Sequence, residues 1–173
     1  MNELMGSMRV GSHADRARMH RRWVRSVHGD VAGLRLELLE PLLASPRYVP
    51  DFLTPSPDRI DARFTDELAR VRSTPDAEVR AQLDLLRGSA PLPKALLSLY
   101  EDPARHLGQL ATEVQAYWRA AIEPIWSRLA GLLDAEIGYR ADQVASGGIV
   151  RLLGNLHPEV EYAEDALRIL WPT

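Results

Sequence analysis

The order of apolar and polar residues along the chain predicts a mainly α-helical protein. Met19, Trp23 and Val27 repeat at intervals of four residues, which marks one apolar stripe on a helix. This helix is expected to open near Asp15 and to end at Asp30. Shorter helical patterns follow, with apolar positions at Phe64, Leu68 and Val71, at Val79, Leu83 and Leu86, and at Leu96, Leu97 and Tyr100.

The longest helical pattern covers residues 103–145 and runs through Pro124. Its apolar positions keep helical phase on both sides of the proline, which favours one kinked helix over two independent ones. A straight helix of roughly 40 residues would be about 60 Å long, whereas a compact domain of this size is only about 40 Å across. A bend or a break at Pro124 is therefore expected, with the carbonyl of Ala120 left unpaired because proline has no N–H.

Proline and glycine set the expected element boundaries. We expect Pro41 near the start of a short helix in the leucine-rich segment 34–43, and an ordered, proline-rich loop against the core over residues 45–57. Two signals mark helix starts, each a capping residue followed by proline: Thr74-Pro75 and Asp102-Pro103. Two signals mark helix stops: Gly88, and Ser146-Gly147-Gly148, which precedes a short helix expected over 149–156. Alternation over residues 160–171 predicts a small hairpin.

These patterns predict an irregular helical bundle around a long Pro-kinked helix, with a small C-terminal β-hairpin. Residues 1–14 are polar, methionine-rich and aperiodic, so we expect a loose N-terminus there. Residues 15–173 are expected to form a single helical domain, because 173 residues suffice for one sizeable core and are few for two.

Composition removes several classes of chemistry. The chain has no cysteine, which excludes disulfides, thiol nucleophiles and thiolate metal sites. It also has no apolar run of membrane-spanning length and no hydrophobic signal-peptide region, so we expect a cytoplasmic protein without a membrane partner.

Neither a metal site nor an enzyme active site is indicated. The five histidines lack the spacing of a helical metal pair or of an HExxH-type arrangement; they are His13, His20, His28, His106 and His157. No nucleophile elbow or phosphate-binding glycine loop occurs, and adjacent acids such as Asp66 and Glu67 suit a helix start. We expect neither a cofactor nor catalysis.

Four arginines form the strongest charge feature. Arg18, Arg21, Arg22 and Arg25 fall in one sector of the first helix, opposite its apolar stripe. They are candidates for contact with nucleic-acid phosphates. The alternative, a solvated helix face paired with acids from elsewhere, is the interpretation that we favour.

Five aromatic residues are candidates for a ligand pocket. Trp118 and Trp126 are eight residues apart on the long helix, and Trp23, Tyr48 and Phe52 could join them around an apolar effector. The alternative is that they are plain core, which a chain with only two phenylalanines must build from tryptophan and leucine. We favour the core interpretation, although a kink at Pro124 would favour a cavity.

One segment carries a family resemblance. The string Tyr48-Val49-Pro50-Asp51-Phe52-Leu53-Thr54-Pro55 resembles the N-terminal domain of actinobacterial ArsR-like winged-helix transcriptional regulators. Further similarity lies in Asp66-Glu67-Leu68-Ala69-Arg70-Val71-Arg72, Tyr117-Trp118, Asn155-Leu156-His157-Pro158 and Arg21-Arg22-Trp23-Val24, so that it covers roughly residues 16–171.

The resemblance implies a regulatory, dimerising or effector-sensing domain of a transcription factor. Family members start further upstream and continue into a winged helix, and neither part is recognisable here. The resemblance therefore implies a possible homodimer and a contact with DNA that is only indirect, through a winged-helix module missing from this chain. A truncated gene product is one explanation. The competing hypothesis is a stand-alone binding module for a small apolar ligand or a protein partner.

Overall fold

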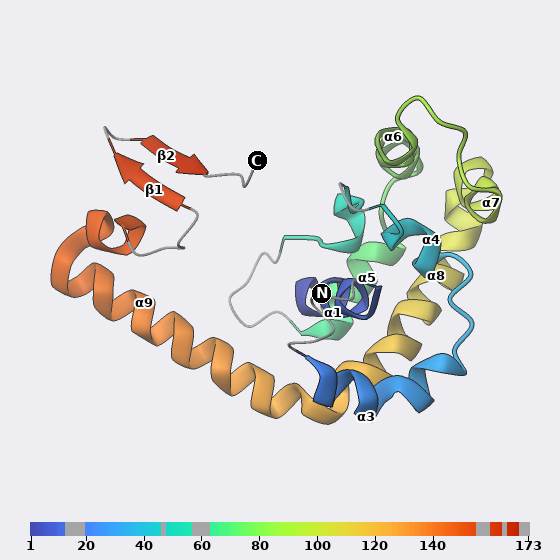
Figure 1. Ribbon diagram of the computed structural model, residues 1–173. Helices are drawn as coiled ribbons and strands as arrows, with labels where there is room; N and C mark the ends of the chain where they lie inside the picture. The colour runs from blue at the N-terminus through green and yellow to red at the C-terminus, as the bar shows by residue number, and fades with distance from the viewer. Residues whose placement is uncertain (13–19, 46–47, 57–62, 155–159, 164–165, 170–173) are drawn as a thin grey trace. The chain divides into compact units, whose positions relative to one another are not determined.

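The computed structural model describes residues 1–12, 20–45, 48–56, 63–154, 160–163 and 166–169 (Figure 1). The described chain is mainly helical, as the sequence patterns predict. It divides into two compact units, residues 1–124 and 125–173, whereas a single domain over 15–173 was expected. The boundary follows Pro124, where the long helix loses its regular α-helical hydrogen bonding.

The first unit consists of helices and short turns. Its α-helices are α1 (Asn2–Ser12), α3 (Arg21–Ala32), α4 (Leu39–Leu43), α5 (Phe64–Arg72), α6 (Asp76–Arg87), α7 (Leu97–Glu101) and α8 (Pro103–Tyr117). Two 3-10 turns, η1 (Asp51–Leu53) and η2 (Lys94–Leu96), lie between them. The short helices expected around Phe64, Val79 and Leu97 are confirmed as α5, α6 and α7, and α3 extends two residues beyond Asp30.

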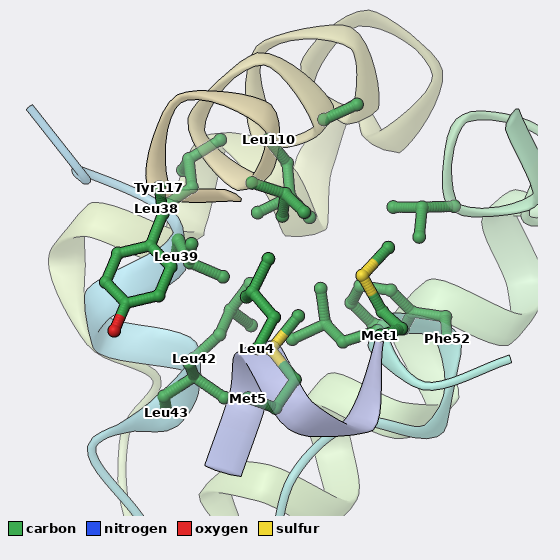
Figure 2. Packing of buried hydrophobic residues seen from close by; sticks show 14 of the residues in the cluster. Met1, Leu4, Met5, Leu38, Leu39, Leu42, Leu43, Phe52, Leu110 and Tyr117 are labelled. Carbon is green, nitrogen blue, oxygen red and sulfur yellow. The ribbon is translucent and has the colours of Figure 1, made fainter. Parts of the chain in front are cut away.

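The core of the first unit is a leucine-rich cluster between α1, α4, η1 and α8 (Figure 2). The largest side chains with less than 2 % exposure are Leu4, Leu39, Leu42, Leu53, Leu83, Leu96, Leu99, Leu107, Leu110 and Ile122. Helix α8 supplies the apolar face against which α4, α5, α6 and α7 pack. Burial of this apolar surface is the main force that holds the unit together.

Residues 2–12 form helix α1, which differs from the loose N-terminus expected for residues 1–14. Met1, Leu4 and Met5 are buried in the core, as Figure 2 shows. These three positions lie at i, i+3 and i+4, so one short face of α1 is apolar. Gly6 and Ser7 then interrupt the apolar pattern, and burial outweighs their poor helix propensity.

Helix α4 begins without a side-chain cap of its own. The buried Glu113 carboxylate supplies one: its Oε2 accepts hydrogen bonds from the backbone N–H groups of Leu38 and Leu39, both at 2.9 Å. Pro41 lies in the first turn of α4, where its missing N–H removes no helical hydrogen bond, as expected. The proline-rich loop packs against the core through buried Pro50, Phe52 and Leu53, also as expected.

The two cap-and-proline signals have different outcomes. Asp102 caps α8 as expected, its carboxylate accepting from the backbone N–H of Arg105 at 3.2 Å, with Pro103 as the first helical residue. The cap of α6 is one residue later than expected, because Pro75 occupies the cap position. The hydroxyl of Thr74 instead donates to the carbonyl of Arg70 in the preceding helix, at 3.2 Å.

The helix that was expected to bend or break at Pro124 is interrupted there. A π-turn (Trp118–Ile122) follows α8, with the N–H of Glu123 donating to the carbonyl of Trp118. A 3-10 turn (Glu123–Ile125) contains the proline and precedes α9. The π-turn is wider than an α-helical turn, and the 3-10 turn is tighter. Together they accommodate Pro124, which has no N–H to donate to the preceding turn of helix.

The second unit contains α9 (Trp126–Gly154) and two strands, β1 (Val160–Ala163) and β2 (Ala166–Ile169). Gly148 breaks α9 with φ 70° and ψ −179°, so the glycine stop is confirmed. The strands pair antiparallel, with Val160 opposite Ile169. Residues 164–165 between them lie outside the described residues, and the expected hairpin stays a prediction.

Candidate functional site

The first unit contains a cavity of about 670 Å³, which we call the Tyr117 pocket. Helices α1, α3 and α4, the segment between α3 and α4, and the last residue of α8 form its walls. Most of the lining side chains are apolar; the full set is Ser7, Met8, Trp23, Val24, Val27, His28, Val31, Ala32, Leu34, Leu36, Glu40, Leu43, Ala44 and Tyr117. Such walls suit an apolar ligand.

Two hydroxyl groups provide a polar point within these walls. The oxygens of Ser7 and Tyr117 are 3.0 Å apart, and the Ser7 hydroxyl also donates to the carbonyl of Leu4, at 2.7 Å. Burial raises the pKa of Tyr117, so its phenol is neutral at physiological pH. His28 and Glu40, both exposed, supply the remaining ionisable side chains of the lining.

Trp23 attaches α3, one wall of the pocket, to the π-turn that follows α8. Its indole N–H donates to the carbonyl of Ala121, at 3.2 Å. Ala121 lies in the π-turn before Pro124, where regular α-helical pairing is interrupted. The sequence predicted a carbonyl left free by the proline, at Ala120; the carbonyl that the indole contacts is that of the next residue.

The five aromatic candidates do not gather around this pocket. Trp23 is the only member of the set among the described lining residues. Phe52 is buried in the core and also borders a second cavity, of about 490 Å³. Trp118 is buried and stacks on Phe64, with 4.3 Å between the ring centroids and 10° between the planes.

Tyr48 and Trp126 lie in other surroundings. Tyr48 is half-buried, its hydroxyl contacts no described hydrogen-bonding group, and burial raises its pKa. Trp126 begins α9 in the second unit, with 37 % of its surface exposed. A role for Tyr48, Phe52, Trp118 and Trp126 in ligand binding stays a prediction, because none of them borders the Tyr117 pocket.

The residues that the sequence analysis missed are Ser7 and Tyr117. They are 110 positions apart, so no local spacing could indicate their contact. Because residues 1–14 were expected to form a loose N-terminus, Ser7 was not among the candidate site residues. The only available signal was indirect: Leu4, Met5 and Met8 share one side of a helix, which would have placed α1 against a core.

The arginine face is exposed where the structure describes it. Arg21, Arg22 and Arg25 are exposed on α3, and no ion pair joins them to a carboxylate in the described parts of the chain. Arg18 lies outside the described residues. Trp23 and Val27, on the same helix, are partly buried against the core, so α3 has an inner face toward the pocket and an outer basic face.

The described residues offer neither a metal site nor a membrane-spanning helix. No group of three or more histidine, aspartate or glutamate side chains within them could hold a metal ion. No described helix is both long enough and apolar enough to cross a membrane.

No protein-family model, curated protein or solved structure matches this chain. The geometry of the Tyr117 pocket is therefore the basis for a functional proposal, and the resemblance to ArsR-like regulators stays a prediction.

Proposed function

We propose that the first unit binds a small, mainly apolar effector in the Tyr117 pocket, as the sensing domain of a bacterial transcriptional regulator. The observation that carries the proposal is the pocket itself. Its volume of about 670 Å³ falls within the range of roughly 300–1,000 Å³ typical of small-molecule sites. Apolar walls with one pair of hydroxyl groups are the usual composition of such sites.

Helix α3 supports a sensing role, because it belongs to both the pocket and the surface. Trp23 and Val27 line the pocket, while Arg21, Arg22 and Arg25 face solvent. No residue of α3 is fully buried, and no side chain caps its start. An effector that fills the pocket would bury more of the inner face and stabilise α3 by about 25 cal/mol per Å² of apolar surface covered.

The regulator part of the proposal rests on the resemblance of the segment around Tyr48–Pro55 to ArsR-like proteins. In such a regulator a winged-helix module reads the DNA, and the arginine face of α3 would at most assist by contacting phosphates. Homodimerisation in the cytoplasm belongs to the same proposal. Light scattering during size-exclusion chromatography tests it, and a strict monomer at high concentration would count against a dimerising role.

Ligand binding is tested by calorimetric titration with 4-hexylphenol, an apolar probe small enough for the pocket. The variant Val27→Trp fills the pocket from α3 and should abolish binding. Val144→Trp is the matched control, because Val144 lies on α9 in the second unit and does not line the pocket. Circular dichroism verifies that both variants keep their helices. Equal binding by the Val27→Trp variant would refute the proposed site.

A stand-alone binding module is the second candidate function. It is favoured by one observation: all described residues of the pocket come from the first unit, so no DNA-binding module is needed to complete it. A mobility-shift assay of the chain with a winged-helix module from its genomic neighbourhood distinguishes the two. An effector that changes DNA binding supports the regulator, and an effector without any influence supports the module.

A further inference from the structure

The hydroxyl pair of the Tyr117 pocket has a defined direction of donation. A serine hydroxyl carries one proton and two lone pairs. The Ser7 proton is used in the 2.7 Å hydrogen bond to the carbonyl of Leu4. The contact of 3.0 Å between Ser7 and Tyr117 therefore has the phenol as its donor and the serine oxygen as its acceptor.

This direction leaves the pair without a proton for a ligand. The phenol oxygen of Tyr117 keeps its lone pairs, Ser7 keeps one, and both protons already have acceptors. Burial raises the pKa of Tyr117, so the phenol keeps the proton on which the arrangement depends. Glu40, the only carboxylate of the described lining, adds a group that accepts and does not donate when ionised.

We propose that the Tyr117 pocket selects apolar molecules that carry a hydrogen-bond donor, such as a phenol, an alcohol or an amine. An ether of the same shape leaves the lone pairs at Tyr117 unpaired. A carboxylate meets only acceptors at the hydroxyl pair, and the exposed His28 is the one ionisable side chain of the described lining that offers it an N–H donor. This inference rests on the proposed function, because it specifies the ligand of the same pocket. An unmatched buried polar group commonly costs about tenfold or more in affinity.

Three matched probes test the selectivity of the full chain by calorimetric titration. They are 4-hexylphenol, which donates; 4-hexylanisole, its methyl ether; and 4-hexylbenzoate, which is anionic. The phenol should bind at least about tenfold more tightly than the other two. Equal affinities, abolished together by Val27→Trp, would overturn the selectivity and leave the proposed function standing. Absence of binding by all three would overturn both.

The variant Ser7→Ala gives a sharper outcome, because it should shift the preference. Without the serine oxygen, the proton of Tyr117 is released and can be donated to a ligand. The anisole and the benzoate should then gain affinity relative to the phenol. Ser26→Ala is the matched control: the Ser26 hydroxyl also donates to a carbonyl three residues earlier, at 2.7 Å, but lies exposed on α3 and outside the pocket lining. A preference unchanged in Ser7→Ala would overturn the assigned direction.

The variant Tyr117→Phe removes the main acceptor and should reduce the advantage of the phenol over the anisole to about threefold or less. Tyr100→Phe is its control, because the Tyr100 hydroxyl donates to Asp84 at 3.3 Å, and Tyr100 does not line the pocket. If Tyr117→Phe only disturbed the packing of the pocket, the affinities of all three probes would fall by the same factor. Retention of the full preference in Tyr117→Phe would overturn the proposal.

Discussion

Removal of the Glu113 carboxylate tests how α4 is held in place. The Oε2 atom of this buried side chain accepts from the N–H groups of Leu38 and Leu39 at 2.9 Å, and its Oε1 accepts from the side-chain amide of Gln109 at 3.0 Å. The two backbone groups start a helix that no local side chain caps. Glu113 is therefore a cap that reaches α4 from α8.

The size of the effect follows from the hydrogen bonds. A hydrogen bond to a charged group contributes about 1.5–3 kcal/mol, and an N-cap exchanged for alanine costs about 0.5–2 kcal/mol. With two backbone donors left buried and a cavity in place of the side chain, Glu113→Ala should lower the free energy of unfolding by about 3–5 kcal/mol. Glu113→Gln keeps one acceptor oxygen and should lose only about 1–2 kcal/mol.

Urea denaturation followed by circular dichroism measures both losses. Glu136→Ala on α9 is the control, since Glu136 is exposed and forms an ion pair with Arg140, with 2.6 Å between Oε1 and Nε; its loss should stay below about 1 kcal/mol. A loss below about 1 kcal/mol in Glu113→Ala would refute the capping argument. Equal losses in the alanine and glutamine variants would show that the negative charge of the carboxylate, and not the packing of the side chain, accounts for the stability.

Three further changes have definite expected outcomes. Trp23→Phe removes the hydrogen bond to the carbonyl of Ala121 and should cost about 1 kcal/mol in urea denaturation; unchanged stability would show that this contact does not hold α3. Gly88→Ala forces a side chain into φ 57° and ψ −123° and should cost about 1–3 kcal/mol by thermal unfolding, whereas the same exchange at the helical Gly131 should be neutral or stabilising. Because burial raises the pKa of Tyr117, unfolding favours the ionised phenol, so stability is fully present below the ordinary tyrosine value of 10.0 and falls as pH rises through the higher folded pKa. Tyr117→Phe should flatten this alkaline loss in a pH series of urea titrations, and an identical slope would contradict the assignment.

The parts of the fold that the sequence predicted depend on neighbouring residues. Gly88 and Gly148 adopt positive φ, a backbone conformation that suits glycine because it has no Cβ. Asp102-Pro103 starts α8 because a carboxylate and a proline both suit the first turn of a helix. Pro124 interrupts its helix because it has no N–H.

The parts that the sequence did not predict depend on distant residues. Helix α1 has a short apolar face, and only packing against the core makes that face sufficient for a stable helix. The cap of α4 comes from Glu113, more than 70 positions away, so the start of α4 shows no capping residue in the local sequence. The aromatic residues were the sequence candidates for a ligand pocket, yet the polar pair of the pocket is formed by Ser7 and Tyr117.

The long chain separation across the pocket has a consequence for how the protein folds. Ser7 meets Tyr117 across 110 positions, and Trp23 meets Ala121 across 98. At a synthesis rate of about 5–20 residues per second, roughly 5–20 s pass between the synthesis of α1 and α3 and the synthesis of Tyr117 and Ala121. Contacts of such high sequence separation also form slowly, because a large loop must close first. The Tyr117 pocket is thus among the last parts of the first unit to assemble, and a nascent chain exposes its apolar walls until residue 121 has been added.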